Sequence, residues 1–190
     1  GVACRVVVRY FGLQLPADQP RWAAHLQLAR RTTLAKSRNH LLFAALRDHD
    51  WVLWLDVDVV SFPDDIVGTM LATGADVVQP HCTREPGGET FDLNAWTDWG
   101  SYHLEDYRGH DTVELHAVGG TMLLVRADCH RDGLVWPAFP YGITDRRARP
   151  RPELIGRPEL GEIETEGLGL LAGALGYDCI GLPDVEILHE

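Results

Sequence analysis

The order of apolar and polar residues predicts alternating helices and strands through the middle of the chain. Residues 51–55 are all apolar, which is typical of a strand buried on both faces of a parallel sheet. Residues 61–73 follow as an expected helix with Pro63 in its first turn, and Gly74 ends it. Residues 75–79 form the next expected strand. This alternation predicts an α/β fold with a mostly parallel sheet.

A long helix is expected ahead of this region, at about residues 21–47. Its clearest part begins near Thr32 or Thr33, either of which is a suitable N-cap. Arg38 lies on the apolar face of this helix, and a charge on a buried face normally has a partner. The apolar face consists of Leu34, Leu41, Leu42 and Ala45.

The remaining expected elements are shorter. Residues 141–160 are rich in Pro and Arg and are expected to form a mobile loop. The other expectations are a strand at 4–10, an irregular polar and aromatic segment at 83–114, a strand at 115–125, a helix at 162–176, and one or two strands at 178–188.

Composition indicates one globular domain spanning residues 1–190. There are 17 Lys and Arg residues against 28 Asp and Glu, and the net charge of −11 argues against nucleic acid or an anionic membrane as the main partner. The longest apolar stretches are too short to span a bilayer, so no membrane segment is expected. Nearly all the positive charge is arginine, which suits bidentate contacts to phosphate.

The cysteines are scattered and form no C-x-x-C pair, so a zinc site is not expected. Two alternatives remain open: buried free thiols, or one or two disulfides in an oxidising compartment. The residues concerned are Cys4, Cys82, Cys129 and Cys179.

Asp56 and Asp58 follow the apolar run directly and are the main candidates for chemistry. Ligands of open α/β sheets bind beyond the carboxyl ends of the strands, where these two side chains emerge. Residues two apart on a strand share a face, so both carboxylates can address one divalent cation and, through it, a diphosphate. The alternative is a pair of strand-end acids that cap turns.

Four further features carry weaker signals. Glu162, Glu164 and Glu166 either complement the dipole of a helix start or point a carboxylate into the cleft to bind a sugar hydroxyl or steady a developing positive charge. The pair Gly119 and Gly120 indicates either tight packing or a close approach of the backbone to a ligand.

The C-terminal His189 is either an ordinary histidine or a metal ligand, and an imidazole beside carboxylates favours Mn²⁺ over Mg²⁺. An arginine group within residues 141–160 is either a solvated loop or a lid over phosphate. Its members are Arg146, Arg147, Arg149 and Arg151.

Several motifs, taken in order along the chain, resemble the Anp1/Mnn9 family of fungal Golgi α-mannosyltransferases. They are LAKSRNHLL at 34–42, WVLWLDVDVV at 51–60, FDLNAW at 91–96, AVGGTMLLVR at 117–126, EIETEGLG at 162–169 and GLPDVEILH at 181–189.

This resemblance implies a GT-A fold, the Rossmann-like αβα sandwich of nucleotide-diphospho-sugar transferases, with its first β-α-β unit expected to be missing from this chain. It also implies a Mn²⁺-dependent, retaining transfer of mannose from GDP-mannose to a mannose of an N-linked glycan. On the matching positions, Asp56 and Asp58 form the D-x-D motif and His189 is the metal histidine. Glu164 and Glu166 belong to an acidic motif on the acceptor side, and Arg38 belongs to the Ser-Arg-Asn motif, where it would assist donor binding together with Gly119 and Gly120.

The resemblance further implies a Golgi lumenal protein, a type II membrane protein at full length, that works with related mannosyltransferase subunits on mannan or N-glycan acceptors. An alternative is a non-catalytic or truncated subunit that supports such a complex. A metal phosphohydrolase is a third reading, but His40, His81 and His116 are too dispersed to supply its ligands.

Overall fold

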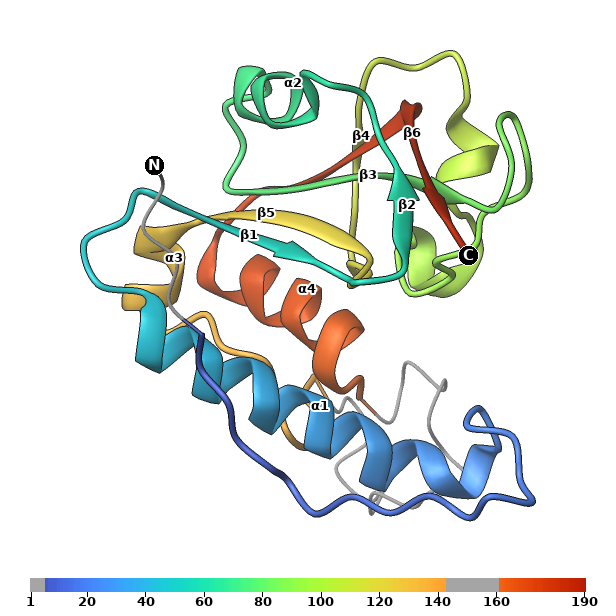
Figure 1. The fold of residues 1–190 in the computed structure, drawn as a ribbon. Coiled ribbons are helices and arrows are strands. Elements are labelled where there is room, and N and C mark those ends of the chain that lie inside the picture. The colour runs from blue at the N-terminus through green and yellow to red at the C-terminus, as the bar shows by residue number, and fades with distance from the viewer. Residues whose placement is uncertain (1–5, 143–160) are drawn as a thin grey trace.

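A computed structural model of the protein describes residues 6–142 and 161–190, and its strands form one six-stranded sheet (Figure 1). The strand order is β1-β5-β3-β6-β2, with β4 beside β6. The strands are β1 Trp51–Leu55, β2 Val59–Ser61, β3 Val77–Thr83, β4 Val113–Glu114, β5 Met122–Arg126 and β6 Cys179–His189.

The sheet is mixed, so the expectation of a mostly parallel sheet is wrong for the described residues. The pair β3 and β6 is parallel, whereas the pairs β1–β5, β3–β5, β2–β6 and β4–β6 are antiparallel. A parallel neighbour requires a crossover connection, usually a helix. The long segment after β3 is irregular instead, and it returns the chain so that β5 runs opposite to β3.

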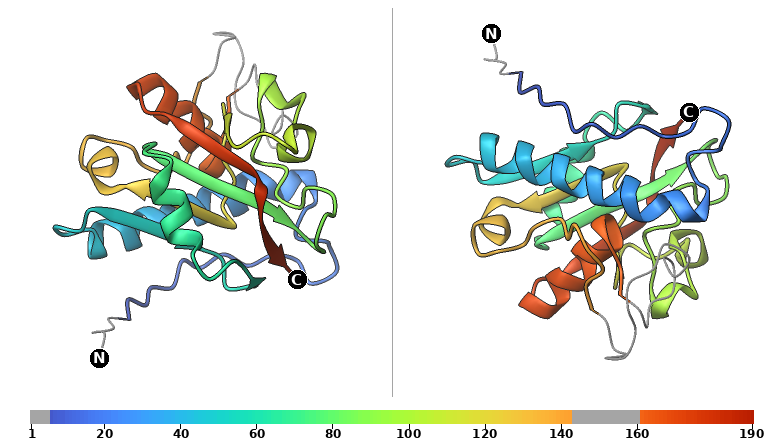
Figure 2. Two further views of the ribbon diagram at one scale, coloured as in Figure 1. Left: turned by 90° about the horizontal axis from the view of Figure 1, so that it is seen from above. Right: turned by 90° about the horizontal axis from the view of Figure 1, so that it is seen from below.

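Helices cover both faces of this sheet (Figures 1 and 2). The short helix α2 lies on one face, and α4 lies on the other with α1 packed against it. The described residues therefore form an αβα arrangement, as expected for an α/β fold. The helices are α1 Ala24–Ala45, α2 Ile66–Ala72, α3 Ala127–Arg131 and α4 Glu164–Leu175, with short 3₁₀ turns η1 Asp98–Gly100 and η2 Leu104–Tyr107.

The two faces of the sheet carry separate apolar cores, and β3 contributes to both. All seven residues of β3 are buried, with Val77 in the core under α4 and Val78 in the core under α2. The apolar run in β1 was expected to be buried in the same way, but β1 lies at the edge of the sheet. Leu53 and Leu55, which share one face of β1, are 40% and 45% exposed, whereas Trp54 on the opposite face is buried.

The long helix α1 confirms the expected element at residues 21–47, although neither proposed cap is correct. Thr33 lies inside the helix, where its hydroxyl donates to the carbonyl of Ala29. Leu41 is exposed, and the buried positions are Arg31, Ala35 and Leu42. The buried face of α1 therefore differs from the apolar face expected from the sequence. It includes arginines whose carboxylate partners lie on α4.

Most other elements agree with expectation, with two exceptions. Residues 6–10, the described part of the strand expected at 4–10, form no strand and leave Val6 and Val8 exposed. The strand expected at 115–125 begins only at Met122, because the preceding residues form a loop in which Ala117 bridges Trp96 and Asp92 accepts from Gly120 and Thr121. Helix α4 ends as expected, with Gly176 in the left-handed conformation.

Cys82, Cys129 and Cys179 are buried free thiols, and Cys4 lies outside the described residues. The loop expected at 141–160 and its four arginines also lie outside them, except for Tyr141 and Gly142. Within the described ranges no helix is both long and apolar enough to cross a bilayer.

Candidate functional site

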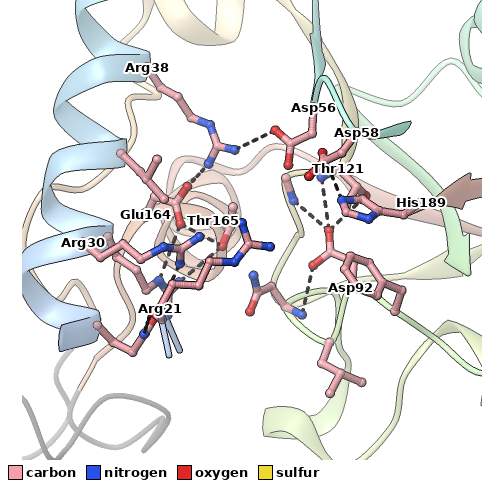
Figure 3. A pocket seen from close by; sticks show the side chains of 17 residues that line it. Arg21, Arg30, Arg38, Asp56, Asp58, Asp92, Thr121, Glu164, Thr165 and His189 are labelled. Carbon is pink, nitrogen blue, oxygen red and sulfur yellow. Dashed lines mark hydrogen bonds and ion pairs between the residues drawn. The ribbon is translucent and has the colours of Figure 1, made fainter. Parts of the chain in front are cut away.

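A cavity of about 380 Å³ lies where α1, the turn after β1, the end of β6 and the start of α4 converge (Figure 3). Acidic side chains and an imidazole line the sheet side, and arginines line the α1 side. Of the residues singled out from the sequence, the cavity lining includes Arg38, Asp56, Asp58, Gly120, Glu164 and His189. Gly119 and Glu166 lie behind this lining, with Gly119 close to Asp92 and Glu166 in contact with Thr165 and Arg31.

The pairing of two short strands brings Asp58 and His189 together. Asp58 lies in the turn between β1 and β2, and the next residue, Val59, pairs with His189 in the antiparallel β2–β6 ladder. The backbone N–H of Glu190 donates to the Asp58 carbonyl at 3.1 Å. As a result, Nε2 of His189 lies 3.0 Å from Oδ1 of Asp58, and both side chains face the cavity.

The His189 ring has an oxygen acceptor at each nitrogen. Nδ1 lies 2.7 Å from the Glu190 carbonyl, which requires a proton on Nδ1 because a carbonyl only accepts. In the neutral ring, Nε2 then directs a lone pair at the Asp58 carboxylate. That contact is favourable only where a proton or a metal cation lies between the nitrogen and the carboxylate oxygen. The ring is also stacked on Phe91, with centroids 4.1 Å apart, which fixes its plane.

This donor set fits a divalent cation, although the described side chains do not complete a coordination shell. No group of three or more His, Cys, Asp or Glu residues within the described ranges is arranged to hold a metal by itself. Asp56, expected as the third member, instead directs its carboxylate toward Arg38 at 3.5 Å. A cation held by Asp58 and His189 would therefore keep open positions for a ligand or water, as catalytic metal sites do.

Asp56 is tied to the floor of the cavity through its backbone and side chain. Its N–H donates to the Thr121 carbonyl at 2.9 Å, which fixes the turn after β1. Partial burial raises the pKa of Asp56, and the neighbouring Arg38 guanidinium opposes that rise.

Four charged side chains from α1 and α4 form a buried ion-pair network behind the cavity. Arg38 pairs with Glu164, and Arg31 pairs with both Glu164 and Glu166. The Arg38 guanidinium also lies 4.5 Å from the centre of the Trp136 ring. This network supplies the partner that Arg38 was expected to have.

Burial dominates the electrostatics of this network. It lowers the pKa of Arg31 to about 10 and lowers that of Arg38 as well, while nearby carboxylates oppose the shift. Glu164 has φ of +61°, an unfavourable conformation for a non-glycine residue. Such strain persists only where the surroundings impose it. Here the ion pairs hold the carboxylate at the cavity wall.

The paired glycines are needed because side chains, rather than a ligand, come close to the backbone. A β-carbon at Gly119 would lie 2.0 Å from the Asp92 carboxylate, and one at Gly120 would lie 2.7 Å from the Arg38 guanidinium. Oδ2 of Asp92 accepts hydrogen bonds from the N–H groups of Gly120 and Thr121 and from the Thr121 hydroxyl. Asp92 therefore anchors the loop that in turn positions Asp56.

Sequence reasoning missed several residues of this site. Asp92 lay within the quoted FDLNAW motif but was given no role. Arg31 lies seven residues before Arg38 on the same face of α1, and this helical spacing was the available signal. Arg21 and Arg30 were assigned no function, yet both line the cavity.

Fold and cavity together define an α/β protein with a charged pocket at one end of its sheet. Residues 11–103 match the sequence model of the Anp1 family. The chain is related to that family, and the resemblance indicated by its motifs is confirmed.

Curated relatives align along nearly the whole chain. The mannan polymerase complex subunit MNN9 of Candida albicans is 28% identical over 216 residues, which covers 93% of this chain and 54% of the relative. Its Schizosaccharomyces pombe counterpart is 28% identical over 210 residues, covering 93% of this chain and 56% of the relative. The mannan polymerase II complex ANP1 subunit of Saccharomyces cerevisiae is 28% identical over 196 residues, covering 84% and 36%. The chain thus spans about half the length of the first two relatives.

Proposed function

We propose that this chain is the catalytic domain of a metal-dependent mannosyltransferase with a GT-A fold. In this proposal it transfers mannose from GDP-mannose to a mannose of a glycan and retains the α-linkage. The observation that carries the proposal is the Asp58–His189 pair, which faces a wall of arginines across one cavity. The kinship with subunits of mannan polymerase complexes supports the choice of sugar.

The charge of the cavity suits a cation and a diphosphate together. Four arginines and four carboxylates line it, so the lining is formally neutral before any ligand binds. Asp58 and His189 would hold the cation, with Asp56 contacting it through water or binding the ribose of the donor. The mixture of oxygen and imidazole donors favours Mn²⁺. The bound metal would supply Lewis-acid stabilisation of the negative charge that builds on the leaving diphosphate.

Glu164 is the side chain best placed to act on the transferred sugar. It lines the cavity and is held by Arg31 and Arg38, so its carboxylate has a fixed position. A fixed carboxylate offsets the positive charge of an oxocarbenium-like sugar in the transition state. Glu166 does not reach the cavity lining. It acts through Arg31, whose guanidinium it shares with Glu164.

We further propose that the acceptor hydroxyl attacks the mannose on the same face from which the diphosphate leaves. No covalent mannosyl-enzyme intermediate forms in this step. Glu164 is a poor nucleophile because its charge is already engaged by two guanidinium groups. Mass spectrometry of the enzyme quenched during turnover should find only unmodified protein. A mannosylated Glu164 or Asp92 would contradict this step.

The names of the relatives describe subunits of mannan polymerase complexes. We therefore propose that the full-length protein works beside related subunits, in the Golgi lumen where such a complex would meet N-glycan or mannan acceptors. A supporting, non-catalytic subunit is the competing function.

A transfer assay separates the two functions. Purified protein is incubated with GDP-mannose, Mn²⁺ and an α-linked mannobiose, and both GDP release and the trisaccharide product are measured. We expect Mn²⁺-dependent product that is lost in Asp58→Ala and His189→Ala and retained in Lys36→Gln, a change on the exposed face of α1. Absence of product together with absence of GDP binding would favour the supporting subunit.

A further inference from the structure

The cavity contains two arginines that the ion-pair network leaves unused. Arg31 and Arg38 are neutralised by carboxylates of α4, as described above. Arg21 and Arg30 also line the cavity, and neither has a carboxylate oxygen within 4.0 Å among the described residues. Figure 3 shows both side chains on the α1 side of the cavity, opposite Asp58, Asp92 and His189.

The side chain of Gln27 contacts both arginine residues, the backbone of Arg21 and the guanidinium of Arg30. Its amide nitrogen donates to the backbone carbonyl of Arg21 at 2.7 Å, and its amide oxygen accepts from Nη1 of Arg30 at 3.5 Å. Arg30 is half-buried, and both its burial and the charge of Arg21 disfavour its positive form. Two like charges that repel each other, with Arg30 partly desolvated, raise the energy of the empty cavity. An anion bound between them would remove that cost.

We propose that Arg21 and Arg30 form an anion subsite that binds a phosphate group directly, without the metal, on the wall opposite Asp58 and His189. Guanidinium groups present paired N–H donors that match phosphate oxygens, so two of them can hold one phosphate through several charge-assisted hydrogen bonds. The subsite thus assigns a ligand class, a phosphate monoester or diphosphate, to residues outside the metal pair.

Two phosphorylated ligands share this chemistry. One is the diphosphate of a nucleotide-sugar donor, and this version rests on the proposed function. The other is a phosphate carried by the acceptor sugar. The subsite itself depends on neither, because its donors are arginines of α1 and of the segment before it.

The test measures phosphate binding with the metal removed. Isothermal titration calorimetry in EDTA at low ionic strength is run with GDP and, separately, with mannose 6-phosphate. Arg21→Gln and Arg30→Gln should each weaken the binding of at least one ligand roughly tenfold, and the double variant should weaken it further. Lys36→Gln is the matched control, because it removes one positive charge from the exposed face of the same helix, and its affinity should stay within about twofold of the unmodified protein.

The two ligands identify the source of the phosphate. Loss of GDP binding in the arginine variants assigns the subsite to the donor, and loss restricted to mannose 6-phosphate assigns it to the acceptor. Equal weakening by Lys36→Gln would show only general charge attraction and would overturn the proposal. Unchanged affinity for both ligands in the double variant would also overturn it.

Failure of this inference and failure of the proposed function can be told apart. Asp58→Ala should retain the metal-free binding, since Asp58 takes no part in the subsite, while losing Mn²⁺-dependent transfer. Arg21 and Arg30 form no ion pair among the described residues, so their variants should keep the melting temperature within about 2 °C. A binding change in a folded variant then reports on the subsite alone.

Discussion

The Arg38 guanidinium lies against the backbone of Gly120, at a distance that leaves no room for a side chain. A β-carbon at Gly120 would be 2.7 Å from a terminal nitrogen of Arg38 and 2.9 Å from the Thr165 methyl group. Because Arg38 is also held by Glu164 and by the ring of Trp136, it cannot swing away freely. The absence of a side chain at Gly120 therefore allows the Arg38 guanidinium to occupy its position.

Gly120→Ala should accordingly destabilise the protein by about 1–3 kcal/mol, the usual cost of overpacking a tight site. The free energy of unfolding in urea measures the effect. Gly173→Ala is the control, since a β-carbon at Gly173 in α4 meets nothing within 4 Å and alanine favours a helix. That variant should be neutral or slightly more stable. Equal losses at the two positions would contradict the packing described for Arg38.

Arg31 should contribute more to the stability of the protein than Arg30, the residue before it. Arg31→Met would leave Glu164 and Glu166 with less compensation in a buried setting, and breaking a buried ion pair in this way costs about 3–5 kcal/mol. Arg30→Met removes the same charge one residue earlier, where no ion pair exists among the described residues, and should change stability by about 0.5 kcal/mol or less. Chemical denaturation of the two variants in parallel gives the comparison. Equal losses in the free energy of unfolding for the two variants would show that the ion pairs of Arg31 do not stabilise the protein.

Two buried histidines predict a loss of stability in mild acid. Burial lowers the pKa of His81 and of His130 below the usual histidine value of about 6.5. Both rings are therefore neutral in the folded protein at a pH where the unfolded chain already binds protons. Stability is fully present above about pH 6.5 and falls as the pH drops below it, by up to about 1.4 kcal/mol per pH unit for each histidine.

Urea denaturation between pH 7.5 and 5.5 measures this slope. In the neutral His81 ring, Nδ1–H donates to the Pro183 carbonyl and Nε2 accepts from the Thr90 hydroxyl, which a second proton would force to reorient. The variant His81→Gln should be less stable at pH 7.5 but should lose less on acidification than the unmodified protein. A steeper or unchanged slope would show that His81 is protonated in the folded state.

The sequence predicted the order of elements better than their placement in the sheet. Helix α1, helix α4 and strands β3 and β6 lie near their expected bounds, because periodicity and glycine stops are local signals. The edge position of β1 was missed, since an unbroken apolar run shows that a strand is apolar but not how many neighbours it has. The antiparallel course of β5 depends on the path of residues 84–121, which has no periodic pattern.

The site was predicted in part for the same reason. Asp56 and Asp58 could be placed at a strand end from local pattern, and both side chains line the cavity. The contact between Asp58 and His189 depends on pairing of β2 with β6, which was not predicted. The family resemblance alone implied that the two side chains act together. Asp92 was not found because its role is to accept hydrogen bonds from a distant loop, and no spacing in the chain encodes that contact.

The most direct test of the central claim is a titration of Mn²⁺ into the protein, followed by electron paramagnetic resonance of the free ion, with and without GDP. The account predicts one bound Mn²⁺ per chain in the presence of GDP. It also predicts at least tenfold weaker binding in Asp58→Asn and in His189→Ala, because loss of even an outer-shell partner commonly costs tenfold. Asp184→Asn, at an exposed carboxylate that accepts from the Gly109 N–H outside the cavity, should bind as the unmodified protein does. Mn²⁺ affinity that is unchanged by Asp58→Asn, or no bound Mn²⁺ with GDP present, would contradict the claim.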